Sequence, residues 1–177
     1  PTDWDLTPFY SQVDVHNYHK YGATGFSNFN GRETPFATVL TNRGCRARCT
    51  FCTVRDFNGF GIKQRPVESV LKEMKFLVNE KGIKQIDFID DDLLWNPSRA
   101  VELFQGMAKE LPGLKWTSTN GLIAAGISDE VMHWMAESGV TAFAIGIESG
   151  NDKMLHTIKK PTTKPKLREK RELFKQY

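Results

Sequence analysis

The stretch "PFATVLTNRGCRARCTFC", residues 35–52, joins an apolar run directly to every cysteine of the chain. Its first part, "FATVLTN" at residues 36–42, is rich in β-branched residues and predicts a β-strand. Cys45, Cys49 and Cys52 follow with the spacing C-x3-C-x2-C. The predicted strand therefore delivers three thiols to one short loop.

A strand followed by a helix recurs four times along the chain. Apolar residues recur at helical spacing from Val67 to Val78, and Gly82 ends that helix. Asn96 and Ser128 are the expected N-caps of two further helices. The later strands begin at Gln85 ("QIDFIDD"), at Lys115 ("KWTSTNGL") and at Val140 ("VTAFAIGIE"), and a last helical segment is interrupted near Pro161. This order predicts an α/β fold with a parallel sheet, and the fourth strand is apolar enough to be buried on both faces.

Polar side chains follow every predicted strand. In parallel α/β sheets, ligands bind at the carboxyl ends of the strands, so these groups should meet at one rim. A purely structural domain has little reason to repeat this placement four times. After the cysteines of the first strand, the later strands end in Asp90, Asp91 and Asp92, in Thr119, Asn120 and Gly121, and in Glu148, Ser149 and Gly150.

The three cysteines favour a metal centre over a disulfide framework. Their number is odd, and no export signal opens the chain, so we expect a reducing cytoplasmic compartment. Structural zinc normally takes four ligands from two separated pairs, and no second pair is present. Three thiolates on a four-iron cluster would leave one iron open. Structural zinc and a redox thiol remain as alternatives.

The pattern C-x3-C-x-aromatic-C after a first strand resembles the radical S-adenosylmethionine (radical SAM) enzymes, with Phe51 at the aromatic position. The likeness runs from about Thr34 to Thr163. "FIDDDLLWN" and "IGIESGNDKML" resemble the subgroup that carries an upstream cobalamin-binding domain, and "DWDLTPF" resembles the connection after that domain. Methylthiotransferases share much of the same pattern.

The resemblance implies a cofactor set and a reaction. Cys45, Cys49 and Cys52 would hold a 4Fe–4S cluster, whose fourth iron chelates S-adenosylmethionine (SAM). An electron from an external donor of the flavodoxin or ferredoxin type would cleave SAM to methionine and a 5′-deoxyadenosyl radical, which abstracts hydrogen from an unknown substrate. Methylation, rearrangement and oxidation are open outcomes, and cobalamin would be bound through the upstream domain.

The resemblance also assigns roles to the residues at the strand ends. Asp90 or Asp91 would accept hydrogen bonds from the SAM ammonium. Most relatives have a Gly-Gly-Glu-like stretch at this place, and this chain does not. Asp92 could equally cap the turn before the next helix. Thr119 and Asn120 are also expected to contact the cofactor, although Asn120 and Gly121 could simply form a turn. Glu148 and Ser149 are expected to bond the ribose hydroxyls. Phe51 would pack on the adenine, or would only fill space in the protein.

Charge adds little to the functional assignment. Arg43, Arg46 and Arg48 flank the cysteines and could offset a cluster's negative charge, while Arg48 could instead face solvent. Residues 159–175 are strongly basic, which is usual for a solvated helix face. The net charge of +3 does not argue for a nucleic-acid partner, and no apolar run approaches the length of a membrane span.

The expected organisation is a lead-in at residues 1–34, connecting from a missing upstream domain, and a core at residues 35–177. The core should be a partial (β/α) barrel of the TIM-like radical SAM type, truncated at its C-terminal side, with about four of the family's six β/α units. Two rival functions remain: a methylthiotransferase-like enzyme that modifies tRNA or protein, and a non-enzymatic iron–sulfur or zinc module acting as a sensor.

Overall fold

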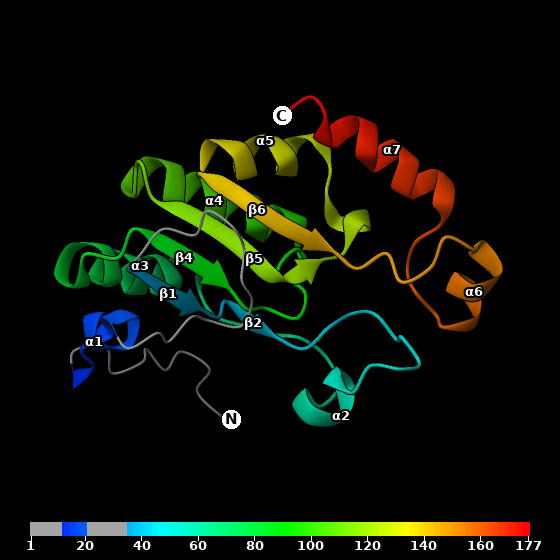
Figure 1. Cartoon of the computed structure of the whole chain (residues 1–177), viewed down its shortest axis with the longest axis horizontal. Helices are drawn as coiled ribbons and strands as arrows, with labels where there is room; N and C mark the ends of the chain where they lie inside the picture. The colour runs from blue at the N-terminus through cyan, green and yellow to red at the C-terminus, as the bar shows by residue number, and fades with distance from the viewer. Residues whose placement is uncertain (1–11, 21–34) are drawn as a thin grey trace.

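The computed structural model describes residues 12–20 and 35–177. Its centre is a sheet of four parallel strands in the order β1-β4-β5-β6, and this order follows the chain (Figure 1). Each strand therefore joins the sheet on the same side of its predecessor, as in a (β/α) barrel. The strands are β1 (Phe36–Val39), β4 (Gln85–Phe88), β5 (Lys115–Leu122) and β6 (Val140–Ile145). The α/β class with a parallel sheet is confirmed.

Three helices cover one face of this sheet (Figure 1). They are α3 (Val67–Lys81), α4 (Pro97–Glu110) and α5 (Asp129–Glu137). The predicted ends are confirmed: the side chains of Asn96 and Ser128 accept hydrogen bonds from the backbone N–H three residues later, and Gly82 ends α3 in the left-handed conformation.

Trp116 lies at the centre of the core between sheet and helices. Its side chain is fully buried, stacks on Phe104 of α4 at 5.0 Å between ring centroids, and meets the ring of Phe88 edge-on. Its Nε1–H donates to the Ser138 hydroxyl over 2.9 Å, so the buried indole nitrogen is satisfied. This packing fixes the helices against the strands that carry the site.

Short elements surround the carboxyl ends of the strands, where α2 and α6 lie (Figure 1). β2 and β3 pair antiparallel with each other. The short elements are α2 (Val54–Asn58), β2 (Asn42–Arg43), β3 (Lys63–Gln64), the 3-10 turn η2 (Ala124–Gly126) and α6 (Asp152–Thr157). The longer helix α7 (Lys164–Phe174) follows α6. Within the described ranges, no helix is both long and apolar enough to cross a membrane.

Some sequence expectations need correction. The lead-in is not wholly irregular, because Val15–Lys20 form helix α1, and its other residues lie outside the described ranges except for 12–14. β1 ends at Val39, since the chain turns there toward the cysteines. The predicted full burial of the fourth strand is wrong: β6 is half-buried, because β5 is its sheet neighbour and none of the other described strands covers its second edge.

Candidate functional site

The three cysteines lie in an excursion between β1 and α3, which the β2–β3 pair closes at its base. We call residues 44–53 the cysteine loop. Gly44 opens it with φ of +94°, and a Cβ there would stand 2.4 Å from the carbonyl oxygen of Gly61. The two arms of the excursion approach so closely that glycine is required at this position.

All three thiols line one cavity of about 230 Å³, which we call the cysteine pocket. Its walls come from the cysteine loop, from α2, from the ends of β4 and β5, and from the segments on either side of α6. Of the predicted site residues, Cys45, Cys49, Cys52, Phe51, Asp91, Asn120 and Glu148 line this pocket. The carboxyl ends of the strands therefore meet at one rim, as the sequence predicted.

The thiols are free and differ in burial. Cys45 and Cys49 are partly buried and Cys52 is exposed. Burial raises the pKa of Cys45, and the Asp92 carboxylate adds to the rise. Burial also raises the pKa of Cys49, while the nearby Lys160 ammonium opposes the rise. Lys160 therefore favours the thiolate form of Cys49, which is the form that binds metals.

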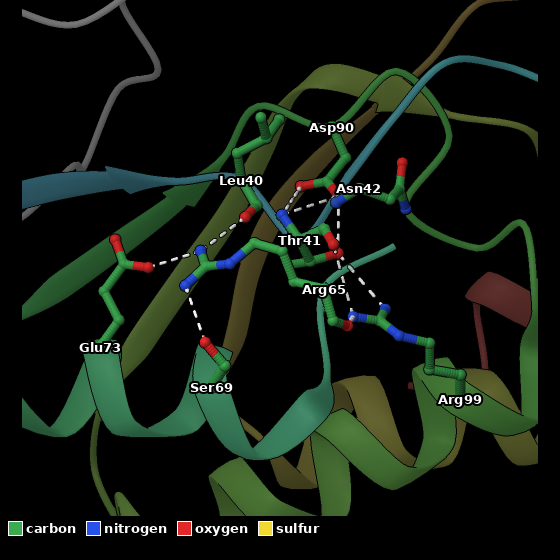
Figure 2. A network of polar contacts seen from close by, with 8 residues as sticks. All are labelled: Leu40, Thr41, Asn42, Arg65, Ser69, Glu73, Asp90 and Arg99. Atoms are coloured by element: carbon green, nitrogen blue, oxygen red, sulfur yellow. Dashed lines mark hydrogen bonds and ion pairs between the residues drawn. The ribbon is translucent and has the colours of Figure 1, made fainter. Parts of the chain in front are cut away.

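The three aspartates after β4 point to different places. Asp90 is fully buried and does not line the pocket: its carboxylate accepts hydrogen bonds from Thr41 N at 3.1 Å, from Thr41 Oγ1 and from Asn42 N, both at 2.6 Å (Figure 2). Burial raises the pKa of Asp90 to about 6 despite these bonds. The structure therefore gives Asp90 a role in the protein interior, in place of the predicted contact with SAM.

Asp91 and Asp92, unlike Asp90, bond the cysteine loop itself. Asp91 Oδ2 accepts from Gly44 N at 3.0 Å and from Asn58 Nδ2 at 2.8 Å, and Asp91 is the aspartate that lines the pocket. Asp92 is buried and forms an ion pair with Arg46, with 3.0 Å between Oδ2 and Nε. Asp92 thus holds an arginine of the loop instead of capping a turn through its side chain.

Two arginines, the buried Arg65 and the half-buried Arg99, brace the root of the cysteine loop (Figure 2). Arg65 donates to the Leu40 carbonyl at 2.9 Å and to Glu73 of α3 at 2.6 Å. Arg99 of α4 donates to the Arg65 carbonyl at 2.6 Å and to the Thr41 carbonyl at 3.4 Å. The end of β1 is therefore tied to two helices before the loop begins.

The end of β5 contributes through Asn120. Its side-chain amide donates to the carbonyl oxygens of Ile89 and Asp90, which joins the ends of β4 and β5 at the pocket. Thr119 does not line the pocket, because its hydroxyl turns inward and donates to the buried Asp87 at 2.9 Å. The predicted cofactor contact of Thr119 is replaced by this internal bond.

Beyond β6, Glu148 reaches the pocket and pairs with Lys160, with 2.8 Å between Oε1 and Nζ. Glu148 is a non-glycine residue with φ of +64°, a strained conformation that is concentrated at functional sites. Ser149 does not line the pocket, and its hydroxyl accepts from the backbone N–H of Asn151. Of the two residues expected to contact the ribose, only Glu148 lines the pocket.

Sequence reasoning missed three residues of the site: Lys160, Arg55 and Asn58. Lys160 and Arg55 line the pocket and supply its positive charge. Asn58 bonds Asp91 from the end of α2. The sequence places Lys160 in a basic run that is typical of a solvated helix face, and it predicts the positive charge from the arginines flanking the cysteines. The structure instead pairs Arg46 with Asp92, while Arg43 and Arg48 are exposed and do not line the pocket.

The donor set fits an iron–sulfur cluster. The sequence holds three cysteines in total, and all three line the same cavity together with two cations. Among the described residues, no three His, Cys, Asp or Glu side chains are placed to hold a single metal ion. A single zinc ion needs all its thiolates within about 2.3 Å, whereas a cluster spreads its irons and accepts thiolates set around a cavity.

Comparison with known proteins agrees with this geometry. The family model described as the radical SAM superfamily matches residues 39–176. The chain is 33% identical over 151 residues to cytidylyl-2-hydroxyethylphosphonate methyltransferase of Streptomyces wedmorensis, covering 81% of this chain and 28% of that protein. It is 30% identical over 156 residues to an uncharacterized methyltransferase of Pyrococcus horikoshii, covering 88% of this chain and 34% of that one. The chain thus spans about a third or less of these relatives.

A solved structure shares the fold. The radical SAM methyltransferase TsrM of Kitasatospora setae, solved with tryptophan and a SAM analogue, superposes with a TM-score of 0.71 at 19% identity, covering 80% of this chain and 28% of TsrM. The partial TIM-like barrel is therefore confirmed, with four β/α units in the described residues. From the family match and the shared cysteine pattern, the chain belongs to the radical SAM superfamily.

Proposed function

We propose that this chain is the catalytic core of a radical SAM enzyme that transfers a methyl group. The observation that carries the proposal is the convergence of Cys45, Cys49 and Cys52 on one pocket with Asp91 and Glu148. When bound there, a reduced 4Fe–4S cluster supplies the electron that cleaves the carbon–sulfur bond of SAM. The chain's own residues bind and orient the two cofactors.

The pocket offers a complement to each polar group of SAM. Lys160 can receive the carboxylate, Asp91 can accept from the ammonium, and Glu148 can accept from the ribose hydroxyls. Lys160 and Glu148 satisfy each other in the absence of ligand, so neither charge is left unpaired in the half-buried pocket. Phe51 lines the same pocket and offers an aromatic face to the adenine.

Methyl transfer is supported by the relatives, whose names include methyltransferases at 30% and 33% identity. We extend the proposal to cobalamin. A solved structure of TsrM contains bound cobalamin, and the enzyme OxsB is described as cobalamin-dependent. The proposal places cobalamin outside the described residues. The substrate of this chain would be set by parts of the relatives that the chain does not span.

Cluster and SAM binding can be tested directly. After anaerobic reconstitution with iron and sulfide, we expect roughly four irons per chain. Addition of SAM should change the electron paramagnetic resonance spectrum of the reduced cluster, and Cys49→Ala should abolish both results. Stoichiometric zinc uptake without iron uptake would instead support a zinc-binding module.

A methylthiotransferase is the second candidate, because the ribosomal protein uS12 methylthiotransferase RimO of Thermosipho melanesiensis is 29% identical over 137 residues. A methylthiotransferase would need a second cluster, whose ligands are not among the three cysteines of this chain. Iron analysis of the whole protein distinguishes the candidates: iron sufficient for one cluster supports methyl transfer, and iron sufficient for two supports methylthio transfer.

A further inference from the structure

The run Asp90–Asp92 stands beside the cysteine loop, and each of its carboxylates bonds a different part of the chain leading through that loop. We propose that these three aspartates are positioning residues, which extend the parallel pairing of β1 and β4 past the sheet and so hold the cysteine loop against the pocket. What the loop binds rests on the proposed function, but how the loop is held does not.

Backbone pairing between the two strands ends just before the aspartates. The last bond runs from Ile89 N to the Val39 carbonyl over 3.2 Å. Beyond it the chains separate, and the backbone N–H groups of the first chain need other acceptors. The side chain of Asp90 accepts from Thr41 and Asn42, as described above. Side chains therefore take over from the backbone at this point.

The next two aspartates bond successive positions further along the chain, within the cysteine loop. Asp91 accepts from Gly44 N at 3.0 Å, and Asp92 is 3.4 Å from Arg46 N. The bonded positions thus rise together along both chains, which is the order of a parallel ladder. Because Asp90 and Asp91 accept through carboxylate oxygens over short distances, their bonds are stronger than backbone bonds. The contact from Arg46 N to Asp92 is longer, and the ion pair with the Arg46 side chain supports it. Two of the bonded positions, Gly44 and Arg46, flank Cys45.

Asp91 has a further role because it bonds both ends of the cysteine segment. Its Oδ2 accepts from Gly44, directly before Cys45, and from Asn58, in the α2 helix that follows Cys52. All three cysteines lie between these two contacts. One carboxylate oxygen therefore fixes the span over which the thiols are presented.

The test measures backbone amide hydrogen exchange in the iron-free chain. In Asp91→Ala, exchange at residues 44–58 should rise about tenfold, as expected for loss of charge-assisted bonds, while β5 stays protected. Asn58→Ala should give a smaller rise in the same residues. Asp91→Asn, which keeps one acceptor oxygen and is the milder change, should lie between wild type and Asp91→Ala. Asp56→Ala, an exposed carboxylate on α2, is the matched control.

Exchange within twofold of wild type in both Asp91→Ala and Asn58→Ala would overturn the inference. If Asp91→Ala does not fold, Asp91→Asn and Asn58→Ala decide the matter by the same criterion. Because the measurement needs no cluster, failure of iron binding in the wild type would sink the proposed function and leave this inference standing. In iron-loaded protein, Asp91→Ala should also lose iron to a chelator about tenfold faster than Asp56→Ala.

Discussion

The surroundings of the Asp90 carboxylate determine its pKa. It is fully buried, and its pKa of about 6 lies above the ordinary value of 3.8. Between these two pH values the folded chain holds a proton that the unfolded chain has lost. The free energy of unfolding should therefore fall as pH rises from about 4 to about 6, and stay level above that, with a total contribution of about 2–3 kcal/mol.

Asp90→Asn should remove this part of the pH dependence. Asparagine keeps one oxygen, and most of the hydrogen bonds to Asp90 converge on Oδ1, so the fold should tolerate the change. Urea unfolding across the pH range, compared with the exposed control Asp56→Asn, measures the effect. A slope between pH 4 and 6 that survives in Asp90→Asn would assign it to other groups.

Lys160 offers a second test at the scale of one residue. Its ammonium lowers the pKa of the Cys49 thiol against the effect of burial, so Lys160→Gln should raise that pKa. In iron-free protein in which Cys45 and Cys52 are serine, alkylation of Cys49 at neutral pH should slow by a factor of about 2–10. Lys153→Gln, an exposed lysine on α6, should leave the rate unchanged. Equal rates in both variants would show that Lys160 does not act on Cys49.

Residue types and spacing predicted which residues lie near the site, but not where their side chains point. Asp90 and Asp91 are neighbours with the same chemistry, yet one is buried against β1 and the other lines the pocket. Thr119 and Asn120 divide in the same way. The direction depends on where each strand ends, and that end is set by contacts across the sheet that a single sequence does not display.

At the scale of elements, the cysteine excursion depends on the close approach of Gly44 to Gly61. Gly44→Ala places a Cβ 2.4 Å from a backbone oxygen at a φ of +94°, whereas Gly59→Ala, at φ of +77°, meets open space. Gly59→Ala should cost about 1–3 kcal/mol of stability from backbone strain alone, because a φ of +77° with a ψ of −173° is a conformation that is essentially confined to glycine. Gly44→Ala should cost more, because the contact with the Gly61 oxygen adds to the strain, and it should reduce iron retention as well.

Urea unfolding and iron analysis of these two variants check the prediction together. Both substitutions add the same methyl group within the same excursion, so the difference between them isolates the contact with Gly61. Equal losses in the two variants would mean that the arms of the excursion can separate freely, and that their approach does not shape the cysteine loop.

The regular elements were predictable because their signals are local. Caps at Asn96 and Ser128 and the glycine after α3 all lie where the sequence placed them. α2 and β3 were not foreseen, because helices of five residues and strands of two carry too few residues for a periodic pattern. Such short elements form through their tertiary contacts, here the pairing with β2 and the bond from Asn58 to Asp91.

For the whole molecule, the aromatic core between sheet and helices should govern global stability. Phe104 is fully buried and stacks on Trp116, so Phe104→Ala should lower the free energy of unfolding by about 3–5 kcal/mol. Phe57, which is 88% exposed beside the cysteine loop, should change it by less than about 0.5 kcal/mol when replaced by alanine. Denaturation followed by circular dichroism measures both, and similar losses would contradict the assignment of the core.

The cysteine loop is also bonded to a segment that comes much later in the chain. Thr50 N donates to the Ile158 carbonyl over 3.0 Å, and Lys160 reaches the same pocket. On a ribosome the thiols emerge roughly a hundred residues, and thus several seconds, before this wall is made. A nascent chain would therefore carry three thiols without this wall until the α6 segment is made. During synthesis of the chain, folding of the α6 segment onto the cysteine loop therefore competes with oxidation of the thiols.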